Sequence, residues 1–359
     1  MRQTFIIGNG AALTLAGAAA VFANTDPSDA VFDAPGYSVV QIATAHREAP
    51  VEVHIWYPTD GMSDGVTTGE NILFDGFDAQ LDAEPAETAS PIVIFSHGSG
   101  GKALQAGWLA SQLAVQDIIV VAPNHQGTMS QDSDPHQTPM IWQRNRDLSA
   151  ALDALETGAL GALVPDMNRV AAVGFSLGGA AALSISGAGL SKDDFIAYCA
   201  MQVEKPDCDW MHDAGVDFSQ INQSLYEADW TDPRISAVLA IDPALTQAMT
   251  AESLAEIEMP MMTLGLGDID TIPMAVDASH LSAVIDQSQH IWIPGAAHFS
   301  FLQAAGSSVK SPPLLWVTIT SVLIWACGLA TLCTQILPKT PAHSWRRCSN
   351  HRPKRWQHA

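Results

Sequence analysis

Short apolar runs alternate along the chain with segments in which apolar residues recur at helical spacing. Residues 92–95, 170–173 and 237–241 are continuous apolar runs, as expected for strands that are buried on both faces of a sheet. Residues 144–155 carry leucines at helical spacing instead. This alternation predicts an α/β fold with a mostly parallel, doubly wound sheet. The length of 359 residues allows one such domain plus terminal extensions.

The segment GFSLGG at 174–179 connects the run 170–173 to an alanine-rich, helix-like stretch at 180–183. A GxSxG sequence between a strand and a helix is typical of a nucleophile elbow, in which the serine occupies a sharp, strained turn. Glycines flank such a serine because β-carbons would not fit there. The pattern predicts Ser176 as a nucleophile, and the alternative is a glycine-rich turn before a core helix.

The sequence HGSGG at 97–101 follows the apolar run 92–95. In hydrolases with a nucleophile elbow, one oxyanion-hole N–H comes from the loop after the third strand and another from the residue after the nucleophile. These positions predict the amides of Ser99 and Leu177. A phosphate-binding loop is the alternative, but it would have Ser or Thr after the lysine, and Lys102 is followed by alanine.

Two aspartates and one histidine stand at the ends of later strand-like runs. The run 237–241 is followed by Asp242, the run 261–266 is followed by Asp268, and the run from residue 290 leads to His298. The chain order Ser, Asp, His is that of a hydrolase triad. We expect His298 as the general base and either aspartate as the group that orients it. His97 and His125 are expected to be structural hydrogen-bonding residues.

Taken together, these segments resemble the α/β-hydrolase superfamily, and more narrowly the bacterial predicted dienelactone hydrolase group, which is similar to platelet-activating-factor acetylhydrolases. The resemblance spans about residues 36–302 and rests on HGSGG, APNHQG, RNRDLSAALDAL, GFSLGG, DPRISAVLAIDPAL and GAAHFSFL. It implies an α/β-hydrolase fold with Ser176 as nucleophile and His298 as base. Acetylhydrolase-like relatives place the acid after the sixth strand, which favours Asp242. Most other members place it after the seventh, so Asp268 stays an alternative.

Residues 188–233 interrupt the strand and helix pattern after the predicted nucleophile helix. The segment is polar and capable of forming helices, so we expect a helical insert. It acts either as a lid over the substrate pocket or as a surface excursion. Cys199 and Cys208 lie close together within it and are expected to pair, which fits an oxidising compartment.

The net charge and the motifs of the chain limit the classes of ligand that it is expected to bind. The formal net charge of −22 argues against nucleic acid and anionic membranes as ligands. The chain has no HExxH and no paired CxxC, so neither a metal site nor a cofactor is expected. Arg2 followed by an apolar stretch up to residue 23 has the layout of a secretory signal peptide over residues 1–23. This predicts a periplasmic or extracellular protein whose catalytic domain covers residues 24–310.

The C-terminal segment departs from the family pattern. Residues 314–337 form an uncharged, apolar stretch, and the basic tail 339–359 follows, in which five arginines or lysines crowd into positions 346–355. One interpretation is a transmembrane helix at 311–338 with the basic tail in the cytoplasm, since about 20 apolar residues cross a bilayer and positive charges stay inside. The other is an aberrant extension, for example from a shifted reading frame.

The sequence therefore predicts an exported serine esterase that acts on a small-molecule ester through an acyl-enzyme. Two alternatives remain from the sequence alone. The first is a peptidase or acyltransferase that uses the same triad, and the second is a catalytically silent, membrane-tethered binding protein. Acyl chain length, alcohol group and oligomeric state are not encoded in these motifs.

Overall fold

The computed structural model describes residues 34–61, 65–72, 74–201, 205–270 and 272–302. The predicted signal peptide, the predicted transmembrane segment and the basic tail lie outside the described residues. Within the described part, no helix is both long and apolar enough to cross a membrane.

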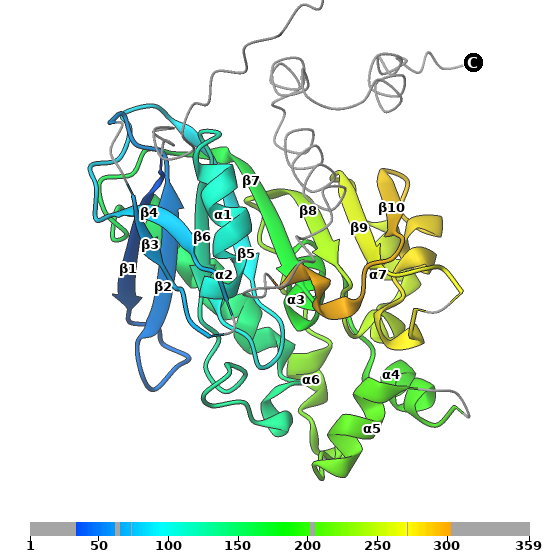
Figure 1. Ribbon diagram of the computed structural model, residues 1–359. Coiled ribbons are helices and arrows are strands. Elements are labelled where there is room, and N and C mark those ends of the chain that lie inside the picture. Colours follow the sequence, from blue (N-terminus) through cyan, green and yellow to red (C-terminus); the bar gives the residue numbers. More distant parts are fainter. Residues whose placement is uncertain (1–33, 62–64, 73, 202–204, 271, 303–359) are drawn as a thin grey trace, which may run out of the picture. The chain divides into compact units, whose positions relative to one another are not determined.

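A single sheet organises the described part of the chain (Figure 1), with ten strands in the order β10-β9-β8-β7-β5-β6-β2-β1-β4-β3. The strands are β1 (Gly36–Ile42), β2 (Val51–Tyr57), β3 (Val66–Thr68), β4 (Phe77–Leu81), β5 (Ser90–Ser96), β6 (Ile119–Pro123), β7 (Pro165–Phe175), β8 (Ile235–Ile241), β9 (Met261–Leu266) and β10 (Ser288–Ile293). Strands β10, β9, β8, β7, β5 and β6 pair in parallel. The antiparallel pairs are β1 with β2, β2 with β6 and β3 with β4, so the predicted mostly parallel sheet is confirmed.

Helices lie on both faces of this sheet. They are α1 (Gly107–Ala114), α2 (Ile141–Glu156), α3 (Leu177–Ile185), α4 (Lys192–Cys199), α5 (Pro206–Asp213), α6 (Gln223–Tyr226) and α7 (Ala251–Ala255). Short 3₁₀ turns are η2 (Ala103–Ala106), η3 (Pro135–Gln137), η4 (Phe218–Gln220), η5 (Thr246–Ala248), η6 (Met274–Val276), η7 (Ser279–Ala283) and η8 (His298–Phe301).

Alternate residues of β5 point into two separate cores. Ile92 and Ile94 belong to the core that contains α2 and α3, while Val93 and Phe95 belong to the core that contains α1. Successive side chains of a strand point to opposite faces of the sheet, so a continuous apolar run fits a sheet covered on both sides. This burial on both faces is the physical reason why the apolar runs predict strands.

The chain reverses its direction of travel across the sheet between β5 and β7. From β5 it proceeds to β6 on one side, whereas β7 is followed by β8, β9 and β10 on the other. In open α/β sheets, ligands bind beyond the carboxyl ends of the strands at such a switch point. The loops that follow β5 and β7 are those that carry Ser99 and Ser176.

Candidate active site

Ser176 stands between the last residue of β7 and the first residue of α3. Its backbone has φ 56° and ψ −120°, a region that non-glycine residues rarely occupy. The Ser176 N–H donates to the Ile241 carbonyl at 2.9 Å, and the Ser176 carbonyl accepts from the Ala244 N–H at 3.0 Å. The strand, the strained serine and the helix thus form the turn that the GxSxG sequence predicts.

Two glycines allow this turn because backbone atoms fill the space where their side chains would lie. A β-carbon on Gly174 would come within 1.9 Å of the Gly178 carbonyl oxygen. A β-carbon on Gly178 would come within 1.9 Å of the Ser96 carbonyl oxygen. The start of α3 is therefore packed directly against the end of β5, which brings the loop after β5 beside the serine.

His298 forms hydrogen bonds to both Ser176 and Asp242. Its Nε2 lies 3.1 Å from Ser176 Oγ, and its Nδ1 lies 3.0 Å from Asp242 Oδ2. A carboxylate only accepts, so Nδ1 carries the proton and Nε2 is free to accept from the serine hydroxyl. The structure thus brings these three sequence-predicted residues together in one chain of hydrogen bonds, although they are separated by 66 and 56 positions in sequence order.

Asp242 is the better placed of the two candidate acids. It follows β8 directly and is fully buried, and its second oxygen accepts the Leu266 N–H at 2.6 Å. Burial raises the pKa of the Asp242 carboxyl, while the hydrogen bonds from His298 and Leu266 lower it. Asp268 lies in the loop after β9 and is exposed. The His298 Nδ1 hydrogen bond goes to Asp242.

Aromatic rings hold the imidazole in place. The Phe175 ring lies 4.8 Å from the His298 ring, and Phe301 stacks on Phe175 with centroids 4.7 Å apart. The Trp108 Nε1–H donates to the Phe301 carbonyl at 3.0 Å, which ties the short turn that carries His298 to α1. These contacts fix the base relative to the serine that follows Phe175.

The two predicted oxyanion amides lie beside the serine. Leu177 is the first residue of α3, so its N–H has no intrahelical acceptor and lies at the positive end of the helix dipole. On the other side, a β-carbon on Gly98 would lie 3.4 Å from the Ser176 β-carbon, so the loop that carries Ser99 adjoins the nucleophile. Ser99 is exposed, and within the described residues its N–H donates to no protein acceptor.

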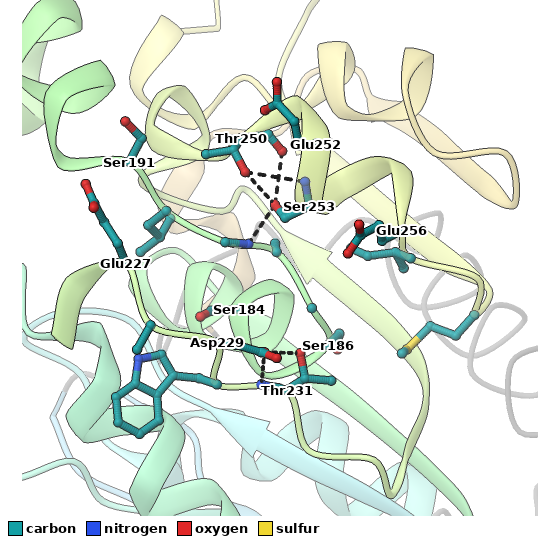
Figure 2. Close-up of a pocket in the computed structure, with 18 of the residues that line it drawn as sticks. Ser184, Ser186, Ser191, Glu227, Asp229, Thr231, Thr250, Glu252, Ser253 and Glu256 are labelled. Carbon is teal, nitrogen blue, oxygen red and sulfur yellow. Dashed lines mark hydrogen bonds between the residues drawn. The ribbon is translucent and has the colours of Figure 1, made fainter. Parts of the chain in front are cut away.

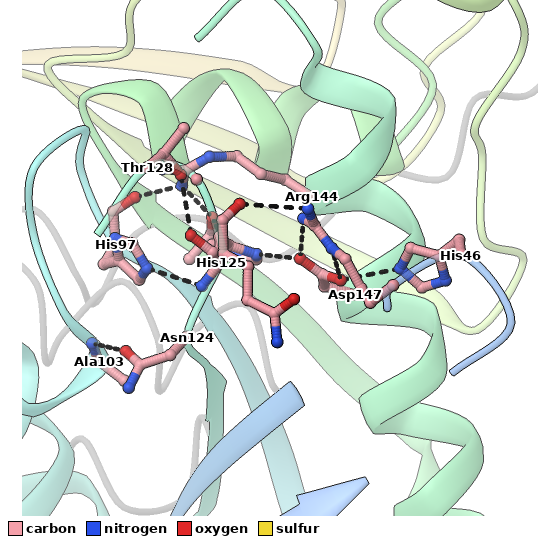
Figure 3. A network of polar contacts seen from close by, with 12 residues as sticks. His46, His97, Ala103, Asn124, His125, Thr128, Arg144 and Asp147 are labelled. Atoms are coloured by element: carbon pink, nitrogen blue, oxygen red, sulfur yellow. Dashed lines mark hydrogen bonds and ion pairs between the residues drawn. The ribbon is translucent and has the colours of Figure 1, made fainter. Parts of the chain in front are cut away.

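Behind this loop lies a buried polar network that the sequence analysis did not predict (Figure 3). Its centre is the fully buried Asp147, which accepts from His125 Nδ1 at 2.9 Å, from His46 Nε2 at 2.8 Å and from Arg47 at 2.6 Å. These hydrogen bonds hold the pKa of the Asp147 carboxyl well below its usual range despite its burial. Burial and the Arg144 charge lower the pKa of His125 to about 4, so its imidazole is neutral. His97 and His125 are thus hydrogen-bonding residues, as predicted.

Two cavities were candidates for the substrate. One, of about 420 Å³, lies beside the Ser99 loop and is lined by Phe74, Phe77, Gly100, Lys102, Leu104 and Trp108 among others. The larger, of about 900 Å³, is drawn in Figure 2. Its lining includes Ser184, near the C-terminal end of α3. At 1.5 Å per residue, Ser184 lies roughly 12 Å along the helix from Ser176. The smaller cavity is lined by Gly100 and Lys102, which belong to the same loop as Gly98, and Gly98 lies against Ser176.

The predicted insert forms helices and contains the predicted disulfide. Cys199, the last residue of α4, is bonded to Cys208 in α5. Helix α4 packs against the η5 turn, and Leu190 pairs with Met249 in an isolated bridge. The insert is thereby fixed to the segment that follows Asp242, and its action as a lid remains a prediction.

A metal centre finds no support in the described part of the chain. No group of three or more His, Cys, Asp or Glu side chains there could hold a metal ion. The oxygen and nitrogen atoms that meet at Ser176 instead form donor and acceptor pairs with one another.

No protein-family model and no curated protein sequence matches the chain. Among solved structures, it is similar to a ferulic acid esterase from Streptomyces cinnamoneus, with 16% identity, a TM-score of 0.58, and coverage of 83% of this chain and 91% of that one. It also matches a dienelactone hydrolase from Anabaena variabilis, with 14% identity, a TM-score of 0.48, and coverage of 81% and 98%. A putative dipeptidyl aminopeptidase IV from Bacteroides ovatus matches with 10% identity and a TM-score of 0.47, and the alignment covers 84% of this chain and 37% of that one.

At these identities the esterase match establishes the architecture alone. The sheet order, the strained serine between β7 and α3, and the esterase match agree on that architecture. The chain therefore has the α/β-hydrolase fold, as its sequence predicted.

Proposed function

We propose that the protein is a serine hydrolase that cleaves carboxylic esters through an acyl-enzyme. The observation that carries this proposal is the continuous chain of hydrogen bonds from Ser176 Oγ through His298 to Asp242. A serine hydroxyl is a weak nucleophile until an imidazole removes its proton, and the imidazole needs a carboxylate to fix its tautomer and stabilise its cation. This arrangement supplies both groups.

The reaction has two stages. Ser176 Oγ attacks the ester carbonyl while His298 Nε2 takes its proton, and the carbonyl oxygen becomes an anion beside the Ser99 and Leu177 amides. His298 then gives the proton to the departing alcohol oxygen as the C–O bond breaks. In the second stage, His298 takes a proton from water, the resulting hydroxide attacks the acyl carbon, and the acid leaves as the proton returns to Ser176. Asp242 stays ionised and orients the imidazole.

The cavity of about 420 Å³ beside Gly100 is our candidate for the part of the ester that does not react. Phe74, Leu104 and Trp108 give it an apolar wall, and Lys102 and Gln105 add polar groups. Pockets of this kind bind small molecules by burying apolar surface and orienting them with a few polar contacts. A small-molecule ester therefore fits this site.

A labelling experiment tests the proposal directly. We expect a fluorophosphonate probe to label the folded protein at Ser176, and the Ser176→Ala variant to remain unlabelled. Burst kinetics with a p-nitrophenyl ester, compared with the matching p-nitroanilide, separate an esterase from a peptidase on the same triad. Folded wild-type protein that neither reacts with the probe nor cleaves the ester would favour the alternative of a catalytically silent binding protein.

We also propose that the protein is exported. The Cys199–Cys208 disulfide supports this, because disulfides persist in oxidising compartments and are rare in the cytosol. An anchor formed by residues 314–337 would keep the enzyme on the membrane. Fractionation of cells that express the full chain tests both points. Esterase activity that stays with washed membranes supports the anchor, activity in the periplasm or medium supports export alone, and activity in the cytosol contradicts both.

A further inference from the structure

We propose that His97 and Arg144 are positioning residues that fix the orientation of the Ser99 amide toward the reacting carbonyl oxygen. This inference rests on the proposed ester cleavage at Ser176. It concerns two side chains that do not touch the substrate and that stand directly behind the loop after β5 (Figure 3).

The first step concerns the peptide group that contains the Ser99 N–H. Its carbonyl oxygen belongs to Gly98 and accepts two hydrogen bonds, from His97 Nδ1 at 2.8 Å and from the Gly101 N–H at 3.1 Å. A trans peptide is planar, and its N–H points opposite to its carbonyl. Two donors that hold the Gly98 oxygen on the inner side therefore direct the Ser99 N–H to the outer side, where Ser99 is exposed.

The second step concerns the tautomer of His97. The His125 backbone N–H donates to His97 Nε2 at 3.0 Å, and a backbone amide can only donate. His97 Nε2 therefore carries no proton, and the proton of the neutral ring is on Nδ1, where it can bond the Gly98 oxygen. Burial and the nearby Arg144 charge hold the pKa of His97 well below its usual value, which keeps the ring in this neutral form.

The third step concerns the buried guanidinium of Arg144. One of its nitrogens, NH1, donates to the His97 carbonyl and to Ser96 Oγ, the latter at 3.2 Å. The other, NH2, donates to Thr128 Oγ1 at 2.8 Å, and the Thr128 carbonyl in turn accepts the Gly100 N–H at 2.9 Å. The planar fork of one arginine thus connects both ends of the loop, which a lysine could not do.

A final layer holds these groups in place. Because Asp147 is an acceptor, His125 donates to it from Nδ1 and accepts from the Ser96 hydroxyl at Nε2, at 2.9 Å. Within the described residues, no carboxylate lies at ion-pair distance from Arg144. The buried positive charge of Arg144 therefore has no directly bound counter-ion in this part of the chain. It lies behind the loop that would face the developing oxyanion, and a positive charge there stabilises that anion.

The test compares variants at His97 in the full chain. Leucine removes the donor to the Gly98 oxygen, whereas the side-chain amide of asparagine can place an N–H near the position of Nδ1. Loss of one oxyanion donor lowers kcat by about 10²–10³, so a misdirected donor should lower it somewhat less. We expect His97→Leu to lower kcat by roughly 10–100-fold with KM within about 3-fold of wild type, and His97→Asn to recover most of kcat.

A second readout separates orientation from general damage to the fold. A trifluoromethyl ketone that adds to Ser176 mimics the tetrahedral oxyanion, so its affinity should fall in proportion to kcat/KM in His97→Leu. The matched control is His290→Leu, which removes a part-buried histidine that hydrogen-bonds to Thr263 in the sheet. We expect this control to lower the melting temperature without changing kcat or inhibitor affinity.

Arg144→Lys provides the independent arm, since lysine keeps the charge but not the fork. We expect kcat to fall by about 10-fold with KM unchanged. The proposal is overturned if His97→Leu behaves like the His290 control, if its defect is confined to KM, or if Arg144→Lys keeps wild-type kcat. Should His97→Leu fail to fold, the asparagine and lysine variants decide the question. A wild-type protein without ester turnover or Ser176 labelling would instead refute the proposed function.

Discussion

Asp242 Oδ2 lies 3.0 Å from His298 Nδ1, across a separation of 56 residues in the chain. The other oxygen of the same carboxylate accepts the Leu266 N–H from the end of the neighbouring strand β9. One oxygen of the buried carboxylate is thus bonded to the imidazole and the other to the sheet. The bond to the sheet fixes the orientation of the carboxylate toward the base. This pair of hydrogen bonds identifies Asp242, and not Asp268, as the carboxylate that orients His298.

We expect Asp242→Asn to lower kcat by about 10⁴-fold, because an amide would hold the imidazole in the wrong tautomer. Asp268→Asn is the matched control and should change kcat by less than about 3-fold, since Asp268 is exposed. Turnover of a p-nitrophenyl ester by both purified variants checks this. A large loss in the Asp268 variant, with activity kept in the Asp242 variant, would reverse the assignment.

The strained turn at Ser176 depends on a glycine two positions later. Gly178→Ala would place a β-carbon 1.9 Å from the Ser96 carbonyl oxygen, so α3 or β5 would have to move. We expect a loss of roughly 3 kcal/mol or more in the free energy of unfolding, or failure to fold. Gly61→Ala is the control, because a β-carbon there meets nothing within 4 Å. Urea denaturation of the two variants measures the difference, and equal stability would contradict the packing.

The buried histidine beneath the loop predicts a pH dependence of stability. Burial lowers the pKa of His125 to about 4 in the folded state, whereas an unfolded histidine titrates near 6.5. Between these values the unfolded state binds more protons, so the free energy of unfolding falls as the pH falls. His125 alone should contribute a loss of about 3 kcal/mol between neutral pH and pH 4.

Asparagine at position 125 can keep the donor to Asp147 but does not titrate. We therefore expect the wild type to lose about 3 kcal/mol more than His125→Asn when urea unfolding is compared at pH 7.5 and pH 4. The comparison cancels the titration of the many surface carboxylates, which both proteins share. Parallel stability curves for the two proteins would show that this histidine is not held neutral.

Features formed by residues close together in the chain could be predicted from the sequence, whereas contacts between distant residues could not. The elbow was predictable because a strand, two close glycines and a helix follow one another within a dozen residues. The choice between Asp242 and Asp268 was not, because both follow strands, and the hydrogen bond that selects Asp242 joins it to a histidine 56 positions away. The Asp147 network was equally hidden, since His46 and Arg47 reach that residue from about 100 positions away and no spacing rule connects them.

The disulfide of the insert makes a prediction that is separate from catalysis. It closes a short loop, with a sequence separation of 9, and chain-entropy estimates for such loops give about 2–3 kcal/mol. The double variant Cys199→Ser and Cys208→Ser should therefore lose about that amount of stability.

The same double variant tests the role of the insert. If the insert only supports the η5 turn, kcat for a small acetyl ester should stay within about 2-fold of wild type at a temperature where both proteins are folded. If the insert acts as a lid, turnover of bulky esters should change while turnover of the acetyl ester does not. An unchanged melting temperature in the double variant would show that the α4–α5 pair does not depend on its bridge.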